Sequence, residues 1–124
     1  MRSLLLLTLA SMLAANSLAC SCFSPELRAK TGRETLELAR VAVFGQIVEV
    51  KADGVADLVV LESFKGPPTG AHMAIEPDAG KCPSHPAIQP GKVLVVAFQA
   101  ANTVCETYDQ DHFLLEAFRA NAAK

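Results

Sequence analysis

The sequence has no tryptophan, a single tyrosine and few aromatic residues in all, 6% of its 124 residues. Charge is sparse as well: the 11 basic and 13 acidic side chains are spread along the chain, and no block of like charge occurs. Nucleic-acid-binding surfaces need basic side chains for the phosphates and usually aromatic rings on which bases stack. The composition therefore argues against a nucleic-acid partner. Internal repeats are also missing, and the length suits one domain with one core.

The beginning of the chain is nearly free of charge, with Arg2 as the only charged residue of an apolar leader. Its apolar segment, residues 4–15, is shorter than a bilayer span requires. Ser17 and Ala19 are small residues at the third and first positions before a cleavage site, as signal peptidase requires. We therefore predict a signal peptide over residues 1–19, a secreted or periplasmic protein, and no membrane segment after cleavage.

Four cysteines follow the leader. Cleavage after Ala19 makes Cys20 the first residue, and Cys22, Cys82 and Cys105 come later. A first-position cysteine also fits a lipoprotein, but lipidation would leave an odd number of cysteines in an oxidising compartment. We therefore expect soluble export with two disulfides that hold a small domain together. A bond between Cys20 and Cys22 would close a strained ring, so two other pairings remain open.

Metal binding is the alternative use of these cysteines. Cys20 and Cys22 together with Cys82 and His85 offer three thiolates and an imidazole, a ligand set for zinc or copper. The thiols would have to stay reduced outside the cytoplasm, which disfavours this interpretation. His72 and His112 have no cysteine or carboxylate at ligand spacing and are interpreted as surface or half-buried side chains. We expect no metal of its own and no cofactor.

Motifs of enzymes are missing too. No serine stands in a nucleophile elbow, and neither a glycine-rich phosphate loop nor a His-Glu-x-x-His helix occurs. Asp109 and Asp111 form a pair of acids, but such a pair suits the start of a helix, where the helix dipole favours negative charge. The sequence therefore predicts a protein that is not an enzyme.

Hydrophobic periodicity beyond the leader predicts short strands. The predicted strands are Val41–Val50, Leu58–Phe64, Ala71–Glu76, Lys92–Gln99 and Thr103–Tyr108. Gly45, in the middle of the first strand, indicates a β-bulge or a sharp coil of the sheet. Asp53 and Gly54 are a turn signal between the first two strands. Residues 77–91 are rich in proline and glycine and are predicted to be a long loop.

A helix is predicted before the strands. Thr31 and Glu34 have the spacing of a capping box, which predicts a short helix near residues 32–40. Ser24 is a good N-cap in front of Pro25, and these two residues can open an earlier turn.

A closing helix is predicted after an Asp109 cap. Its apolar face would hold Phe113, Leu114, Ala117 and Phe118. Five strands, one helix before them, one after them and no alternation of strand with helix indicate a mainly β fold. We predict a five-stranded antiparallel barrel of the OB type, with a sandwich of the same strands as the alternative.

The order of several short motifs carries a family resemblance. The motifs are Cys20-Ser21-Cys22, the passage from Leu38 to Val48, Phe64-Lys65-Gly66-Pro67, Cys82, the segment from Gly91 to Val95, and Cys105. In this order the chain resembles the tissue inhibitors of metalloproteinases and, more broadly, the netrin-like modules, in particular the short bacterial members. Residues 20–124 would form one such domain. Animal members carry a proline two residues after the second cysteine, where this chain has Ser24, and they have a third disulfide and a second domain.

The resemblance implies both a disulfide pairing and an activity. The implied disulfides join Cys20 to Cys82 and Cys22 to Cys105. The free amine and the carbonyl oxygen of Cys20 would chelate the catalytic zinc of a protease, which keeps an open coordination position. An α-amino group has a pKa near 7.7–8.0, so its deprotonation on metal binding costs little at neutral pH. Ser21 would enter the specificity pocket, with Cys22 and Phe23 as flanking contacts.

The implied partner is an extracellular or periplasmic zinc metalloprotease, bound by a monomer. The alternative is a non-inhibitory exported module that binds another envelope or extracellular protein, in which the disulfides only hold the domain together. Both hypotheses predict the same fold and the same compartment. They differ in whether the N-terminal amine of Cys20 takes part in binding.

Overall fold

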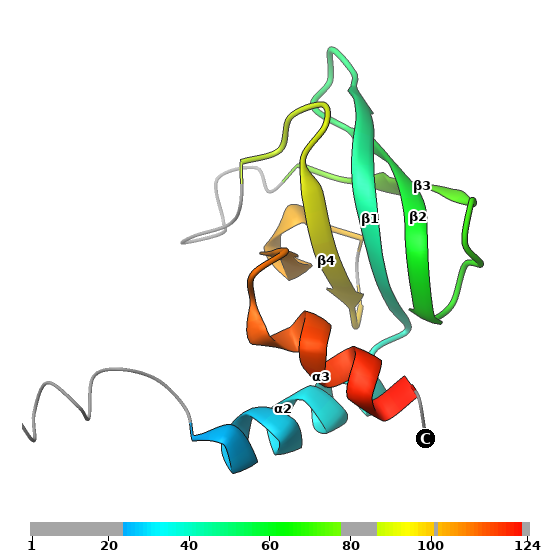
Figure 1. Ribbon diagram of the computed structural model, residues 1–124. Helices are drawn as coiled ribbons and strands as arrows, with labels where there is room; N and C mark the ends of the chain where they lie inside the picture. Colours follow the sequence, from blue (N-terminus) through cyan, green and yellow to red (C-terminus); the bar gives the residue numbers. More distant parts are fainter. Residues whose placement is uncertain (1–23, 78–86, 101, 123–124) are drawn as a thin grey trace, which may run out of the picture.

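Strands dominate the computed structural model, which describes residues 24–77, 87–100 and 102–122. The strands are β1 (Val41–Val50), β2 (Ala56–Lys65), β3 (His72–Ile75), β4 (Val93–Phe98) and β5 (Thr107–Asp109). They form one antiparallel sheet in the order β3-β2-β1-β4-β5. Helices α2 (Pro25–Leu38) and α3 (Phe113–Ala122) lie next to each other at one end of the sheet, and the 3-10 turn η1 (Val104–Glu106) precedes β5 (Figure 1). Within the described ranges, neither helix is long and apolar enough to cross a membrane.

The sheet is strongly coiled because β1 and β2 do not pair residue for residue. The register shifts at three points, leaving Val48, Leu61 and Phe64 without a paired residue opposite them. Such bulges bend a strand and increase its twist. The predicted irregularity at Gly45 is confirmed at one of these shifts, where a Cβ would lie 2.4 Å from Leu58 Cδ2. Only glycine fits where β1 and β2 approach each other this closely without moving the neighbouring strand.

The predicted antiparallel sheet is confirmed, whereas the predicted closed barrel is not, because the sheet is open between β3 and β5. An isolated parallel bridge joins the two edges at Glu76 and Thr103. The Glu76 amide donates to Asn102 O at 2.7 Å, and the Val104 amide donates to Glu76 O at 3.0 Å. The predicted strand over Thr103–Tyr108 is wrong in its first half, which forms η1 instead. The remaining strand β5 has three residues and pairs with β4 alone among the described strands.

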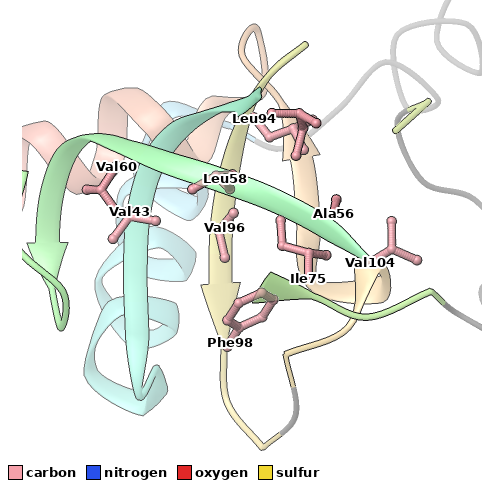
Figure 2. Packing of buried hydrophobic residues seen from close by; sticks show 10 residues of the cluster. Val43, Ala56, Leu58, Val60, Ile75, Leu94, Val96, Phe98 and Val104 are labelled. Atoms are coloured by element: carbon pink, nitrogen blue, oxygen red, sulfur yellow. The ribbon is translucent and has the colours of Figure 1, made fainter. Parts of the chain in front are cut away.

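The main core fills the concave side of the coiled sheet (Figure 2). Its members are almost fully buried aliphatic side chains from β1 to β4 and η1, together with the ring of Phe98. The labelled residues in Figure 2 are Val43, Ala56, Leu58, Val60, Ile75, Leu94, Val96, Phe98 and Val104. Val104 belongs to this core although η1 is not a strand, so the 3-10 turn covers the open side of the sheet.

A second core joins the opposite face of β1 and β4 to the helices. Its buried members are Ala39, Ala42, Val95, Ala97, Leu114, Leu115 and Phe118. The predicted apolar face of the closing helix is confirmed for Leu114 and Phe118, both buried. Phe118 also contacts the ring of Phe64, the unpaired bulge residue of β2, at a centroid distance of 5.6 Å. The bulge therefore supplies a contact that fixes α3 on the sheet.

The first helix differs from its prediction in where it begins. The helix starts at Pro25, and Ser24 caps it by accepting the Leu27 amide hydrogen at 3.2 Å. The earlier turn that Ser24 and Pro25 indicated is thus the real start, and the capping box at Thr31 and Glu34 is wrong. Both of its residues lie inside a 14-residue helix.

The cap predicted for the closing helix is also wrong. The Asp109 carboxylate pairs with Lys92 Nζ on the β4 side instead. The side chain at the start of α3 that accepts a hydrogen bond from the helix is His112, whose Nδ1 lies 3.2 Å from the Leu114 amide nitrogen.

Candidate functional site

The residues predicted to act on a protease lie outside the described ranges, which begin at Ser24. This applies to Cys20, Ser21, Cys22 and Phe23, and also to Cys82 and His85 of the alternative metal set. Their roles and the metal alternative therefore stay predictions.

Cys105 is the one predicted disulfide residue in the described part of the chain. It is exposed in η1 and is disulfide-bonded. The described ranges hold no second cysteine, so the pairing with Cys22 implied by the family resemblance stays a prediction.

The first turn of α2 lies at the N-terminal end of the described residues and is firmly capped. Ser24 caps this turn twice, because its side chain accepts from the Leu27 amide and its carbonyl accepts from the Arg28 amide at 3.0 Å. Pro25 at the first helical position has no amide hydrogen to satisfy and a backbone angle that suits a helix. Four residues, 20–23, separate this turn from the predicted cleavage site, a reach of roughly 14 Å when fully extended.

An open groove of about 800 Å³ lies next to this turn. Side chains from the first turn of α2, from the loop after β5 and from α3 line it, among them Arg28, Asp111, His112, Phe113, Glu116 and Arg119. Its walls carry two arginines and two acids, so charge alone selects neither an anion nor a cation. Its wall also carries the rings of His112 and Phe113, which belong to a row of three neighbouring rings.

The rings of Tyr108, His112 and Phe113 form this row. The centroids of Tyr108 and His112 are 4.8 Å apart, and those of His112 and Phe113 are 4.6 Å apart with the ring planes 28° from parallel. The Arg28 guanidinium lies 6.0 Å from the Phe113 centroid, at the limit of a cation–π contact. The row therefore links β5, α3 and α2 through their side chains.

Burial shifts the pKa values of two members of the row. Desolvation lowers the pKa of His112 below its usual value, although the negative charges of Asp111 and Asp109 act in the opposite direction. Desolvation also raises the pKa of Tyr108, and the charge of Glu106 adds to that shift. Both rings are thus held in their neutral forms at neutral pH.

Arg119 at the other end of the groove fixes α3 to the sheet. Its guanidinium donates to the Glu62 carboxylate of β2, with Nη2 to Oε1 at 2.7 Å, and lies 5.7 Å from the Phe44 centroid. The hydrogen bond to Glu62 raises the pKa of Arg119, which stays charged at every accessible pH. This side chain therefore has a structural partner.

No three histidine, cysteine or acidic side chains of residues 24–77, 87–100 and 102–122 lie together as metal ligands. His72 of β3 is exposed and contacts the Asp57 carboxylate of β2 at 3.0 Å, a cross-strand pair. His112 is half-buried in the ring row. Sequence reasoning placed both histidines at or near the surface but missed the cap that His112 provides. The available signal was its position directly before the apolar face of the closing helix, where a capping side chain is expected.

Comparisons with models of known protein families and with curated proteins found no match. The family resemblance therefore depends on the order of motifs in the sequence alone.

Proposed function

We propose that the mature protein is an exported inhibitor of zinc metalloproteases and that its free N-terminus at Cys20 binds the catalytic zinc. The observation that supports this function is the position of α2. The helix is capped at Ser24, so residues 20–23 alone separate the predicted new N-terminus from a packed helix. A chelating terminus has to be short, and the cap at Ser24 leaves only four residues before the helix.

The energetic reason is the cost of ordering. Fixing one free residue costs about 1–2 kcal/mol, so a long flexible tail would lose much of the affinity that chelation provides. A segment of four residues, two of them cysteines, has few bonds left to order on binding. The amine and carbonyl oxygen of Cys20 would take the open position of the protease zinc. Ser21 would then contact the specificity pocket, with Cys22 and Phe23 beside it.

Two disulfides, Cys20–Cys82 and Cys22–Cys105, complete the proposal. Each would close a long loop, and a loop of about 60–85 residues contributes roughly 4 kcal/mol to stability in the chain-entropy model. The bonded state of Cys105 supports this pairing without naming its partner. The bonds would also hold the N-terminal segment in one position for the protease.

We propose in addition that the open sheet is a minimal barrel of the OB type. In an OB barrel the third and fifth strands close the cylinder, and here the isolated bridge between Glu76 and Thr103 links the corresponding edges. Val104 of η1 fills the core at that point. A short closing contact of this kind agrees with a small domain in which a disulfide at Cys105 strengthens the same edge.

A second candidate function is a non-inhibitory module that binds another exported protein. The observation that favours it is the exposure of two apolar bulge residues, Val48 and Leu61, each 44% exposed although they lie in the central strands β1 and β2. A partner protein that covered these two side chains would remove their apolar surface from water. In this case binding would depend on Leu61 and not on the amine of Cys20.

The experiment compares three purified forms that were exported and processed: the authentic protein, a form with one residue added before Cys20, and Leu61→Lys. Each form is assayed against a panel of zinc metalloproteases, with circular dichroism as the folding control. Inhibition by the authentic protein that is lost with the added residue supports chelation, because the extension converts the amine of Cys20 into a peptide amide that cannot bind zinc in this way. If the authentic protein inhibits nothing in a broad panel, or if the extended form inhibits equally well, chelation is wrong.

A further inference from the structure

The start of α3 is capped in an unusual way. The first amides of a helix have no partner within the helix and need an acceptor from a side chain or from water. Here the acceptor is the imidazole of His112, whose Nδ1 lies 3.2 Å from the Leu114 amide nitrogen. A ring nitrogen can accept only when it carries no proton, so this hydrogen bond assigns the neutral tautomer with its proton on Nε2.

We propose that His112 is a protonation switch for the first turn of α3, which is capped while the ring is neutral and opens when the ring takes up a proton. Protonation at Nδ1 turns the acceptor into a donor and leaves the Leu114 amide without its partner. It also puts a positive charge at the N-terminus of a helix, where the macrodipole already presents positive charge. Both effects act against the capped form.

The surroundings of the ring decide at which pH this happens. The ring of His112 lies between Tyr108 of β5, to which it is tilted, and Phe113 of α3, on which it stacks, and its burial lowers its pKa below the usual 6.5. Asp109 at the end of β5 and Asp111 in the following loop act against this shift, but the Asp109 carboxylate is already paired with Lys92, which directly precedes β4.

The other charged groups around the groove belong to the helices. Arg28 of α2 lies over the Phe113 ring, and Glu116 and Arg119 of α3 line the groove. Arg28 and Arg119 add positive charge on this side, and Arg119 has the Glu62 carboxylate as its own partner. Among the described residues, no carboxylate forms an ion pair with the ring of His112.

The direction of the pH dependence follows from the lowered pKa. In the open turn the ring is in water and takes up its proton near pH 6.5, whereas in the capped turn it does so at lower pH. The capped form therefore has its full stability above pH 6.5 and loses it as the pH falls below that value. Below the lowered pKa both forms are protonated, and no further loss from this group occurs.

The consequence is a groove whose wall depends on pH. The wall next to α2 contains His112 and Phe113, and both belong to the turn that opens. Mild acid would thus change the shape of the groove while the sheet keeps its structure, because the main core does not include α3. This inference is independent of protease inhibition.

Amide hydrogen exchange of the full mature protein tests the proposal. The protection factor of the Leu114 amide, corrected for intrinsic exchange, is measured at pH 7.5 and pH 5.0. Loss of an N-cap lowers helix stability enough to reduce this protection roughly 3- to 30-fold. The amide of Val95 in β4 serves as the reference and should keep its protection. An NMR titration of the His112 ring in the same protein should give a midpoint below 6.5, and the Leu114 amide shift should follow it.

Two variants separate the cap from general acid effects. His112→Asn keeps a side-chain acceptor at the cap but cannot titrate, so Leu114 should stay protected at both pH values. His72→Asn removes another histidine, which is exposed on β3, and should keep the acid-induced loss. The proposal is overturned if His112→Asn loses protection on acidification as the natural protein does. It is equally overturned if the His112 ring titrates at or above pH 6.5.

Discussion

Gly32→Ala is a sharp test of how the two helices pack. Gly32 lies inside α2 and is buried, and a Cβ built on it would stand 2.2 Å from the Cβ of Ala117 in α3. Real Cβ atoms do not approach so closely, and both atoms are held by backbone. The helices would have to separate by more than an ångström, which would loosen the second core around Phe118.

The expected magnitude is the balance of two terms. Alanine stabilises a helix interior by about 1 kcal/mol relative to glycine, whereas forcing an extra methyl into a packed contact costs about 1–3 kcal/mol. We expect Gly32→Ala to lower the free energy of unfolding by about 1–2 kcal/mol. The packing cost should lie at the upper end of its range, because the backbones of α2 and α3 fix both Cβ atoms and neither can rotate away. Thermal unfolding should show this as a melting temperature lower by several degrees.

The matched variant is the exchange of the two residues. Ala117→Gly alone should destabilise α3 by about 1 kcal/mol through helix propensity, and Ala120→Gly at an exposed site of α3 controls for that term. The double variant Gly32→Ala with Ala117→Gly moves the methyl group from α3 to α2, which removes the clash. The gain in helix propensity in α2 then offsets the loss in α3. It should unfold within about 0.5 kcal/mol of the natural protein. A Gly32→Ala single variant that is more stable than the natural protein would refute the reasoning.

The remaining predictions concern processing, pairing and the sheet. The intact mass of exported protein should correspond to a chain that begins at Cys20 without lipid, whereas a mass that keeps earlier residues or a diacylglycerol group would contradict soluble export. Peptide mapping without reduction should find Cys22 joined to Cys105 and no free thiol. Four free thiols with stoichiometric zinc would favour the metal site instead. Gly45→Ala should lower the free energy of unfolding by about 1–3 kcal/mol, because its Cβ would meet the Leu58 side chain and Val59 O; unchanged denaturant midpoints would contradict this.

The strands and their turns could be predicted because their signals are local. Apolar runs bounded by turn residues defined β1, β2 and β4 to within about two residues, a pattern typical of strands that are buried on one or both faces. The turn at Asp53 and Gly54 was equally readable: Gly54 has a φ of +90°, and the Asp53 side chain accepts the Val55 amide hydrogen at 3.1 Å. Both residues favour such a turn whatever surrounds it.

The candidate site was predicted only in part. The order of cysteines and the leader point to residues 20–23, but those residues lie outside the described part of the chain. The groove at the first turn of α2 could not be predicted, because Arg28 is far from His112 and Phe113 in the sequence. Nothing local in the sequence brings a loop after β5 next to the first turn of α2.

The tertiary structure alone decided what two further residues do. Gly32 resembled part of a helix start in the sequence, but its role is the close approach of α2 to α3, which depends on Ala117 far along the chain. His112 caps α3 because burial between two rings keeps it neutral. Periodicity fixes which face of an element is apolar, whereas partners distant in sequence decide how close two elements come and which side chain completes a helix end.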